Sequence, residues 1–287
     1  MAILQRGYQG YSGELTSTLH RPLVIFRYAI ADVFSSRLFA AFFALCFIPP
    51  LALMCTIYMR YNLNVLTQFQ VPLDELMSID ARFFASWMQR PQMILSFVMI
   101  MFIGPTLISP DLRNNALPLY LSRPIDKPSY IFGKLLVLLV LGSIITWVPG
   151  VLLILFQAYL AEDGWLIDNL RVPMAAIASA LVWIVSLSML SLAVSAWVKW
   201  KVIARLLFFA LVFFGSALGA AIRGIFGGWA GSLVSLFDSV EVLITGLYGV
   251  DNWHRMPGWA AGTVFLTITL VSSILLTRRI RAFEVVS

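Results

Sequence analysis

Residues 135–158 read LLVLLVLGSIITWVPGVLLILFQA, and they include no acidic, basic or histidine side chain. At 1.5 Å per residue, a helix of this length is about 36 Å long and can cross a hydrocarbon core roughly 30 Å thick. A charge at the bilayer centre costs at least a few kcal/mol, so the complete absence of charge favours a membrane environment. The stretch therefore predicts a transmembrane helix.

Five further stretches are apolar and equally free of charged and histidine residues. They are residues 38–59, 93–109, 174–198, 206–222 and 259–277. Each has 17 to 25 residues, close to the roughly 20 that a spanning helix needs. The expected fold class is an all-α membrane protein, with six transmembrane helices in one domain over residues 38–277.

The composition of the whole chain agrees with a membrane protein. Of its 287 residues, 60% are apolar and 12% are charged, whereas a soluble domain is typically about 25% charged. So few charges argue against a soluble enzyme, a nucleic-acid-binding domain and a disordered chain. The two cysteines exclude a disulfide scaffold.

The net charge of +6 is distributed unevenly between the predicted spans. The segments with a positive balance, +9 in total, are 1–37, 110–134, 199–205 and 278–287. The alternate segments, with −3 in total, are 60–92, 159–173 and 223–258. By the positive-inside rule, both termini are expected in the cytoplasm, and the basic excess reports topology rather than a nucleic-acid partner. We expect residues 1–20 to form a polar tail without a signal peptide, and 278–287 a basic cytoplasmic tail.

Residues 21–37 are expected to form an amphipathic helix on the inner membrane surface, before the first span. Its polar face carries Arg27 and Asp32, and Val24 and Ile25 break the apolar pattern. The apolar face consists of Leu23, Phe26, Ile30, Val33 and Phe34. A cytosolic helix packed on the bundle is the alternative.

The outer segment 223–258 is too apolar for an ordinary loop, and Asp238 and Glu241 interrupt its apolar run. It fits either a re-entrant or a surface-lying helical pair, since irregular backbone is not tolerated against lipid. Just before it, Gly215 and Gly219 form a GxxxG pattern that would permit close helix contact.

Several kinds of chemistry are missing from the chain. It has no P-loop sequence, its two histidines lie outside the predicted spans, and no cluster of His, Cys and acidic residues has metal-ligand spacing. The predicted spans also lack the charged residue that ion-coupled carriers usually place in the membrane. We therefore expect no enzyme activity, cofactor or metal in this chain, and a pathway powered from outside.

The cytoplasmic segment 110–134 has the most specific pattern. Asn115 can cap a short helix that Pro124 ends. Leu117, Tyr120 and Leu121 then form an apolar face about two turns long, suited to docking in a groove of a soluble partner.

An acidic residue, two leucines, a Ser-Arg-Pro-Ile stretch and a Gly-Lys pair follow one another in this segment. They are Asp111, Leu117, Leu121, Ser122-Arg123-Pro124-Ile125 and Gly133-Lys134. In this order, after a second span, the segment resembles that of the permease subunits of ABC-2 type ABC transporters. Asn115-Ala116 and Asp126-Lys127 replace the family's usual Gly-Thr or Gly-Ser and Ser/Thr-Arg pairs. The six spans and the cytoplasmic termini extend the resemblance over nearly the whole chain.

The resemblance implies an exporting permease of the bacterial inner membrane, paired with a second permease and with two copies of a separate ATPase that binds ATP and Mg. Residues 112–125 would couple to that ATPase, through charged contacts of Arg113 and Arg123 and apolar contacts of the leucine face. The interface residues expected are Asp111, Arg113, Leu117, Tyr120, Leu121, Arg123, Pro124 and Lys134, with Arg27 and Asp32 as further candidates. The alternatives are an ATP-independent carrier or lipid scramblase, and a non-transporting membrane scaffold.

Overall fold

The computed structural model describes residues 20–62, 78–116, 126–161 and 164–280. Over these residues the chain is helical and has no strand, which confirms the expected all-α class. Six of its helices are long and apolar enough to cross a membrane. They cover Arg37–Tyr61, Ala81–Arg113, Lys127–Leu160, Arg171–Trp197, Lys201–Phe226 and Gly258–Arg279. Each predicted span lies within one of these helices, except that the fourth runs one residue past its helix.

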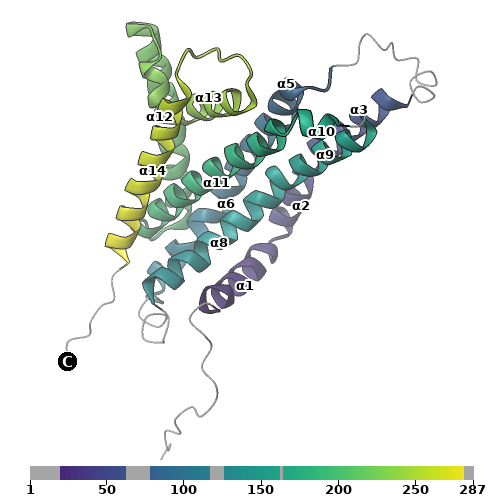
Figure 1. Ribbon diagram of the computed structural model, residues 1–287. Helices are drawn as coiled ribbons and strands as arrows, with labels where there is room; N and C mark the ends of the chain where they lie inside the picture. Colours follow the sequence, from purple (N-terminus) through teal and green to yellow (C-terminus); the bar gives the residue numbers. More distant parts are fainter. Residues whose placement is uncertain (1–19, 63–77, 117–125, 162–163, 281–287) are drawn as a thin grey trace, which may run out of the picture.

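Several of these long helices are divided, and short helices lie between them (Figure 1). The elements are α1 (Arg21–Phe34), α2 (Arg37–Leu45), α3 (Ile48–Tyr61), α5 (Ala81–Phe83), the π-helical turn η2 (Phe84–Gln89), α6 (Arg90–Arg113), α8 (Lys127–Ile145), α9 (Trp147–Leu160), α10 (Trp165–Asp168), α11 (Arg171–Trp197), α12 (Lys201–Phe226), the 3₁₀ turn η3 (Ala230–Leu233), α13 (Leu236–Tyr248) and α14 (Gly258–Arg279).

Helix α11 lies at the centre of the bundle, packed against α6, α8, α9, α12, α13 and α14. Its Trp183 is fully buried and donates from Nε1 to the carbonyl of Met93 and to the Ser96 hydroxyl, both at 3.1 Å. In the spans that contain α6, α8–α9 and α11, more than half of the 18-residue apolar stretch of each span is buried. In the spans of α2–α3, α12 and α14 the buried share is 11%, 22% and 28%. The bundle thus has three interior and three peripheral spans.

Proline divides the first span. Pro50 has no N–H to donate to the carbonyl of Cys46, four residues earlier, and the helix is interrupted between α2 and α3 at this point. Gln92 of α6 donates from its side-chain amide to the Cys46 carbonyl at 3.2 Å. A buried carbonyl that the proline deprives of its helical donor is thereby satisfied by a neighbouring span.

The segment before the first span differs in its boundaries from the expected single helix over 21–37. Helix α1 ends at Phe34, and α2 begins at Arg37, where Ser36 Oγ accepts from the Phe39 amide. Helix α1 packs on the start of α8, and a Cβ added at Gly133 would be 2.9 Å from Ile25 Cβ. Ile25, which interrupts the apolar pattern in the sequence, is therefore a packing residue.

Segment 223–258, predicted to lie on the outer side, contains η3 and the 13-residue helix α13. The backbone of η3 and of Val234 directly after it, rather than another spanning helix, lies against the predicted GxxxG pattern. A Cβ at Gly219 would be 2.5 Å from the Gly231 carbonyl oxygen, and one at Gly215 would be 3.0 Å from that of Val234. The two glycines thus allow a turn to approach α12 more closely than any side chain would permit.

Candidate functional site

The predicted coupling residues fall partly outside the described part of the chain. Five of them lie outside the described residues: Leu117, Tyr120, Leu121, Arg123 and Pro124. The structure places the other five: Asp111 and Arg113 in the last turn of α6, Lys134 in α8, and Arg27 and Asp32 on α1. These elements meet at one end of the bundle, which we call the Asp111 end (Figure 1).

Asp111 and Lys134 form an ion pair between α6 and α8. Lys134 Nζ is 2.9 Å from Asp111 Oδ2, and the hydroxyl of Tyr130, one turn before Lys134, donates to the same oxygen at 2.6 Å. The two charged side chains are 10% and 16% exposed, and Tyr130 is fully buried. A buried pair of this kind is costly to break, because the remaining charge is left without its counter-ion. The pair holds together the two ends of segment 112–133.

Arg113 lies at the surface, beside the connection between α11 and α12. Its guanidinium carbon is 4.6 Å from the centre of the Trp200 ring, and Trp200 is itself 57% exposed. A guanidinium over an indole face is attracted by the ring quadrupole. This contact joins the predicted cytoplasmic segments 110–134 and 199–205, which the sequence treats as separate.

Helix α6 ends in a defined motif. The amide of Ala116 donates to the Asp111 carbonyl at 2.8 Å, and that of Asn115 to Leu112 at 3.5 Å. Asn115 has a φ of 51°, in the left-handed region that this C-terminal motif requires and that asparagine tolerates. Asn115, expected to begin the next helix, is thus the residue that terminates α6.

Helix α8 begins at Lys127, directly after Asp126. Asp126 is its N-cap residue, and its carboxylate accepts a hydrogen bond from the Ser129 hydroxyl at 2.6 Å. That hydrogen bond, more than the nearby Arg21, lowers the pKa of the Asp126 carboxyl below its usual value. The Asp126 side chain is therefore a carboxylate at neutral pH, and its negative charge interacts favourably with the positive end of the α8 dipole.

Ser195 of α11 connects the end of α6 to the centre of the bundle. Its hydroxyl accepts from the amide of Ser109 at 2.9 Å and donates to the carbonyl of Pro105 at 3.1 Å, while Ser109 Oγ donates to the Ser195 carbonyl. Pro105 and Pro110 interrupt the hydrogen bonding of α6 on either side. Buried hydrogen bonds thus link the C-terminal half of α6 to α11.

Helix α1 contributes an exposed surface at the same end. Arg27 and Asp32 are both exposed, on a helix that packs on α8 beside Gly133. They lie on the element that adjoins the Asp111–Lys134 pair, without a described contact to the pair. Both side chains are accessible to a partner.

Sequence reasoning missed three contributors to this end: Tyr130, Ser195 and Trp200. Tyr130 lies four residues before Lys134, the spacing of one helical turn, which would have indicated a shared face. Ser195 is one of five buried serines of α11, and nothing in their sequence pattern distinguishes it. Trp200 lies in segment 199–205, and nothing in the sequence of that segment indicates its contact with Arg113.

At the Asp111 end, an ion pair and hydrogen bonds join the ends of three helices. Within the described ranges, no group of three His, Cys, Asp or Glu side chains could hold a metal ion. No protein-family model matches this chain, and comparison with curated proteins finds no match.

Proposed function

We propose that this chain is the permease subunit of an ABC exporter, spanning a bacterial inner membrane with both termini in the cytoplasm. The observation that carries the proposal is the buried Asp111–Lys134 pair at the base of segment 112–133. It supports a coupling role because a segment with a fixed base transmits a push to both spans instead of bending. The resemblance of residues 111–134 to ABC-2 permeases supports the same assignment.

In the proposed mechanism, the energy comes from a separate ATPase that binds ATP and Mg. Closure of two ATPase copies presses on the apolar face of Leu117, Tyr120 and Leu121, while Arg113 and Arg123 make charged contacts. The Asp111–Lys134 pair passes this motion to α6 and α8 together, and Ser195 passes it to α11.

A second permease subunit completes the proposed assembly, with the cargo passing between the two. Helix α12 supports this role because it is one of the least buried spans and exposes many large apolar residues. An ATP-independent carrier or a scaffold remains the competing assignment if no ATPase binds.

The test uses the double variant L117D/L121D, which places two charges on the predicted docking face. The full chain is co-expressed with each P-loop ATPase that its neighbouring reading frames encode, purified in detergent and assayed for co-purification and ATP hydrolysis. We expect the amount of ATPase that co-purifies with the variant to fall at least tenfold. Burying two carboxylates in the interface costs more than about 1.4 kcal/mol of binding free energy.

The matched control is I167D, at an exposed apolar position in α10, far from the Asp111 end (Figure 1). It is expected to retain the ATPase. Co-purification and transport that both survive in L117D/L121D would contradict the docking assignment. The absence of any ATPase gene nearby would contradict the permease assignment itself.

A further inference from the structure

Helix α13 is attached to three spanning helices by three arginines at the end of the bundle opposite Asp111. We call this the Glu241 end. Arg90 is the first residue of α6, Arg171 the first of α11, and Arg223 lies in the last turn of α12. Spans far apart in the sequence thus converge on one 13-residue helix.

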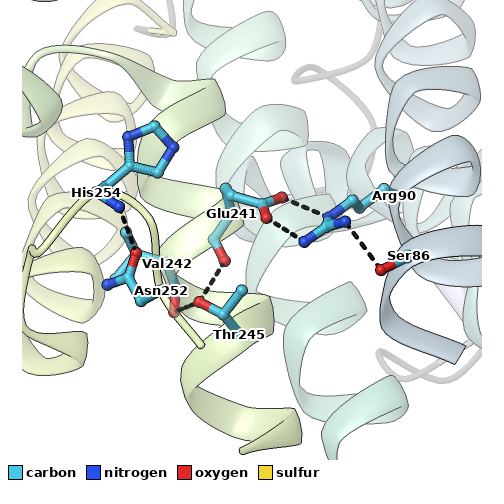
Figure 2. A network of polar contacts seen from close by, with 7 residues as sticks. All are labelled: Ser86, Arg90, Glu241, Val242, Thr245, Asn252 and His254. Carbon is cyan, nitrogen blue, oxygen red and sulfur yellow. Dashed lines mark hydrogen bonds and ion pairs between the residues drawn. The ribbon is translucent and has the colours of Figure 1, made fainter. Parts of the chain in front are cut away.

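The contact with α6 is bidentate (Figure 2). Arg90 Nε donates to Glu241 Oε2 at 2.8 Å, and Arg90 Nη2 pairs with Oε1 of the same carboxylate. A third nitrogen of Arg90 donates to Ser86 Oγ at 2.9 Å, which fixes the guanidinium plane. The side chains of Arg90 and Glu241 are 33% and 22% exposed, so water reaches this pair.

The contact with α12 involves the other acidic residue of α13. Arg223 pairs with Asp238, three residues before Glu241 and therefore on the same side of the helix. The Arg223 guanidinium also donates to Ser232 Oγ at 3.2 Å, which ties it to η3.

The contact with α11 uses the C-terminus of α13. Arg171 donates to the carbonyls of Leu247 at 2.7 Å and Gly246 at 2.9 Å, two of the last carbonyls that lack helical partners. The positive charge also favours the negative end of the helix dipole. Gly249 follows with a φ of 73°, and a Cβ there would be 2.6 Å from the Arg171 guanidinium.

Glycines with positive φ flank the segment that contains η3 and α13. Gly227 and Gly228, with φ of 66° and 69°, precede η3, and Gly249 follows α13. Glycine changes its backbone angles at little steric cost, so these positions can act as hinges. A helix of 13 residues is also marginal by itself, and its position depends on the contacts it makes.

We propose that α13 is a strap that closes the Glu241 end and opens as a unit about the glycine hinges when its arginine contacts separate. The strap holds α6, α11 and α12 together, and its release lets these three spans move apart at this end. The inference goes beyond the proposed function and holds or fails without an ATPase.

The test is hydrogen–deuterium exchange of the full chain in nanodiscs of phosphatidylethanolamine and phosphatidylglycerol. In E241Q, one charge of the bidentate pair is removed, and we expect amides 239–250 to exchange about tenfold faster. In the charge-swapped variant R90E/E241R, which restores a pair, we expect exchange within about threefold of the original chain. Residues 179–195 of α11 are expected to stay protected in both.

The matched control is R82Q. It breaks the Arg82–Asp251 pair beside the strap, whose side chains are 64% and 92% exposed, and it is expected to leave the exchange of α13 unchanged. A second variant, R171A, removes the contact at the other end of α13 and is expected to accelerate amides 244–250. R171A also provides the test of the proposal if E241Q does not fold.

Two results would overturn the proposal. Exchange of α13 that does not change in E241Q and R171A would show that the arginines do not hold it. Exchange that rises equally in α13 and in residues 179–195 would show that α13 opens only when the whole bundle unfolds.

Discussion

The two ends of the bundle are held by ion pairs of different kinds. At the Asp111 end, one pair with 10% and 16% exposed side chains joins consecutive spans, and Tyr130 and Asp111 are 19 residues apart in the chain. At the Glu241 end, the Arg90–Glu241 pair is more exposed, at 33% and 22%, and it joins residues that are 151 positions apart. The first arrangement makes a rigid base for a local segment, and the second makes a fastening that solvent can help to release.

The largest expected difference between the ends comes from removing one cation at each. K134M leaves the buried Asp111 carboxylate without its counter-ion, and we expect a loss of about 3–5 kcal/mol of unfolding free energy. R90M leaves the better solvated Glu241, and we expect a loss of about 1–3 kcal/mol. Denaturant unfolding in detergent measures both. The double variant D111N/K134M should recover most of the loss, and a cost for K134M below that for R90M would reverse the comparison.

The backbone contact of α12 with η3 tests the Glu241 end without touching a charge. G219A places a methyl group against the carbonyl of Gly231, and we expect it to cost about 1–3 kcal/mol through local displacement. Gly262 of α14 has no atom near the position of an added Cβ, so G262A is the matched control and should be neutral or slightly stabilising. Equal thermal stability of the two variants would contradict the close approach.

The surface contact at the Asp111 end should have a smaller effect. R113A and W200A each remove the cation–π contact, and we expect each to cost about 0.5–1 kcal/mol. The double variant should cost less than the sum of the two, because both remove the same interaction. Strict additivity in thermal unfolding would show that the two residues act independently.

The smallest expected effect is a pH dependence at the Glu241 end. Burial lowers the pKa of His254 below its usual value, and the positive charge of Arg223 lowers it further. The negative charge of Glu241 has a smaller, opposite effect on this pKa. The unfolded chain then binds a proton at His254 more readily than the folded chain, so stability falls as the pH falls below about 6.5. We expect faster amide exchange of residues 252–256 at pH 5.5 than at pH 7.5, after correction for the intrinsic rate. H254Q should lose this difference, and an unchanged difference in that variant would assign it to another group.

The positions of the six long helices could be predicted from the sequence because charge is excluded from the roughly 20 residues of each helix that cross the hydrocarbon core. The ends of these helices could not be predicted in the same way, because the helices extend beyond the charge-free windows. The second window, 93–109, belongs to a helical stretch over Ala81–Arg113, since Arg90 and Asp111 are accommodated at its two ends by Glu241 and Lys134. A charge that finds a partner does not end a helix, and a count of charged residues cannot anticipate that.

The sequence names candidate site residues without the contacts between them, and their role at an ATPase interface stays a prediction. Asp111 and Lys134 were assigned as separate points of an interface, and the structure brings them together. Arg27 and Asp32 lie on a helix beside them, exposed as a partner surface requires. The role of the leucine face stays a prediction, because Leu117 and Leu121 lie outside the described residues.

The sequence by itself determined the class of this protein and the number and order of its apolar helices, because hydrophobic length is a local property of consecutive residues. The tertiary structure alone decided which helix ends meet: Lys134 with Asp111, Arg90 with Glu241, and Gly219 with a 3₁₀ turn instead of a helix. The physical reason is that several segments could supply the counter-ion of a charge. Several could likewise supply the backbone that packs closely against a glycine. The packing of the spans around α11 selects among these partners.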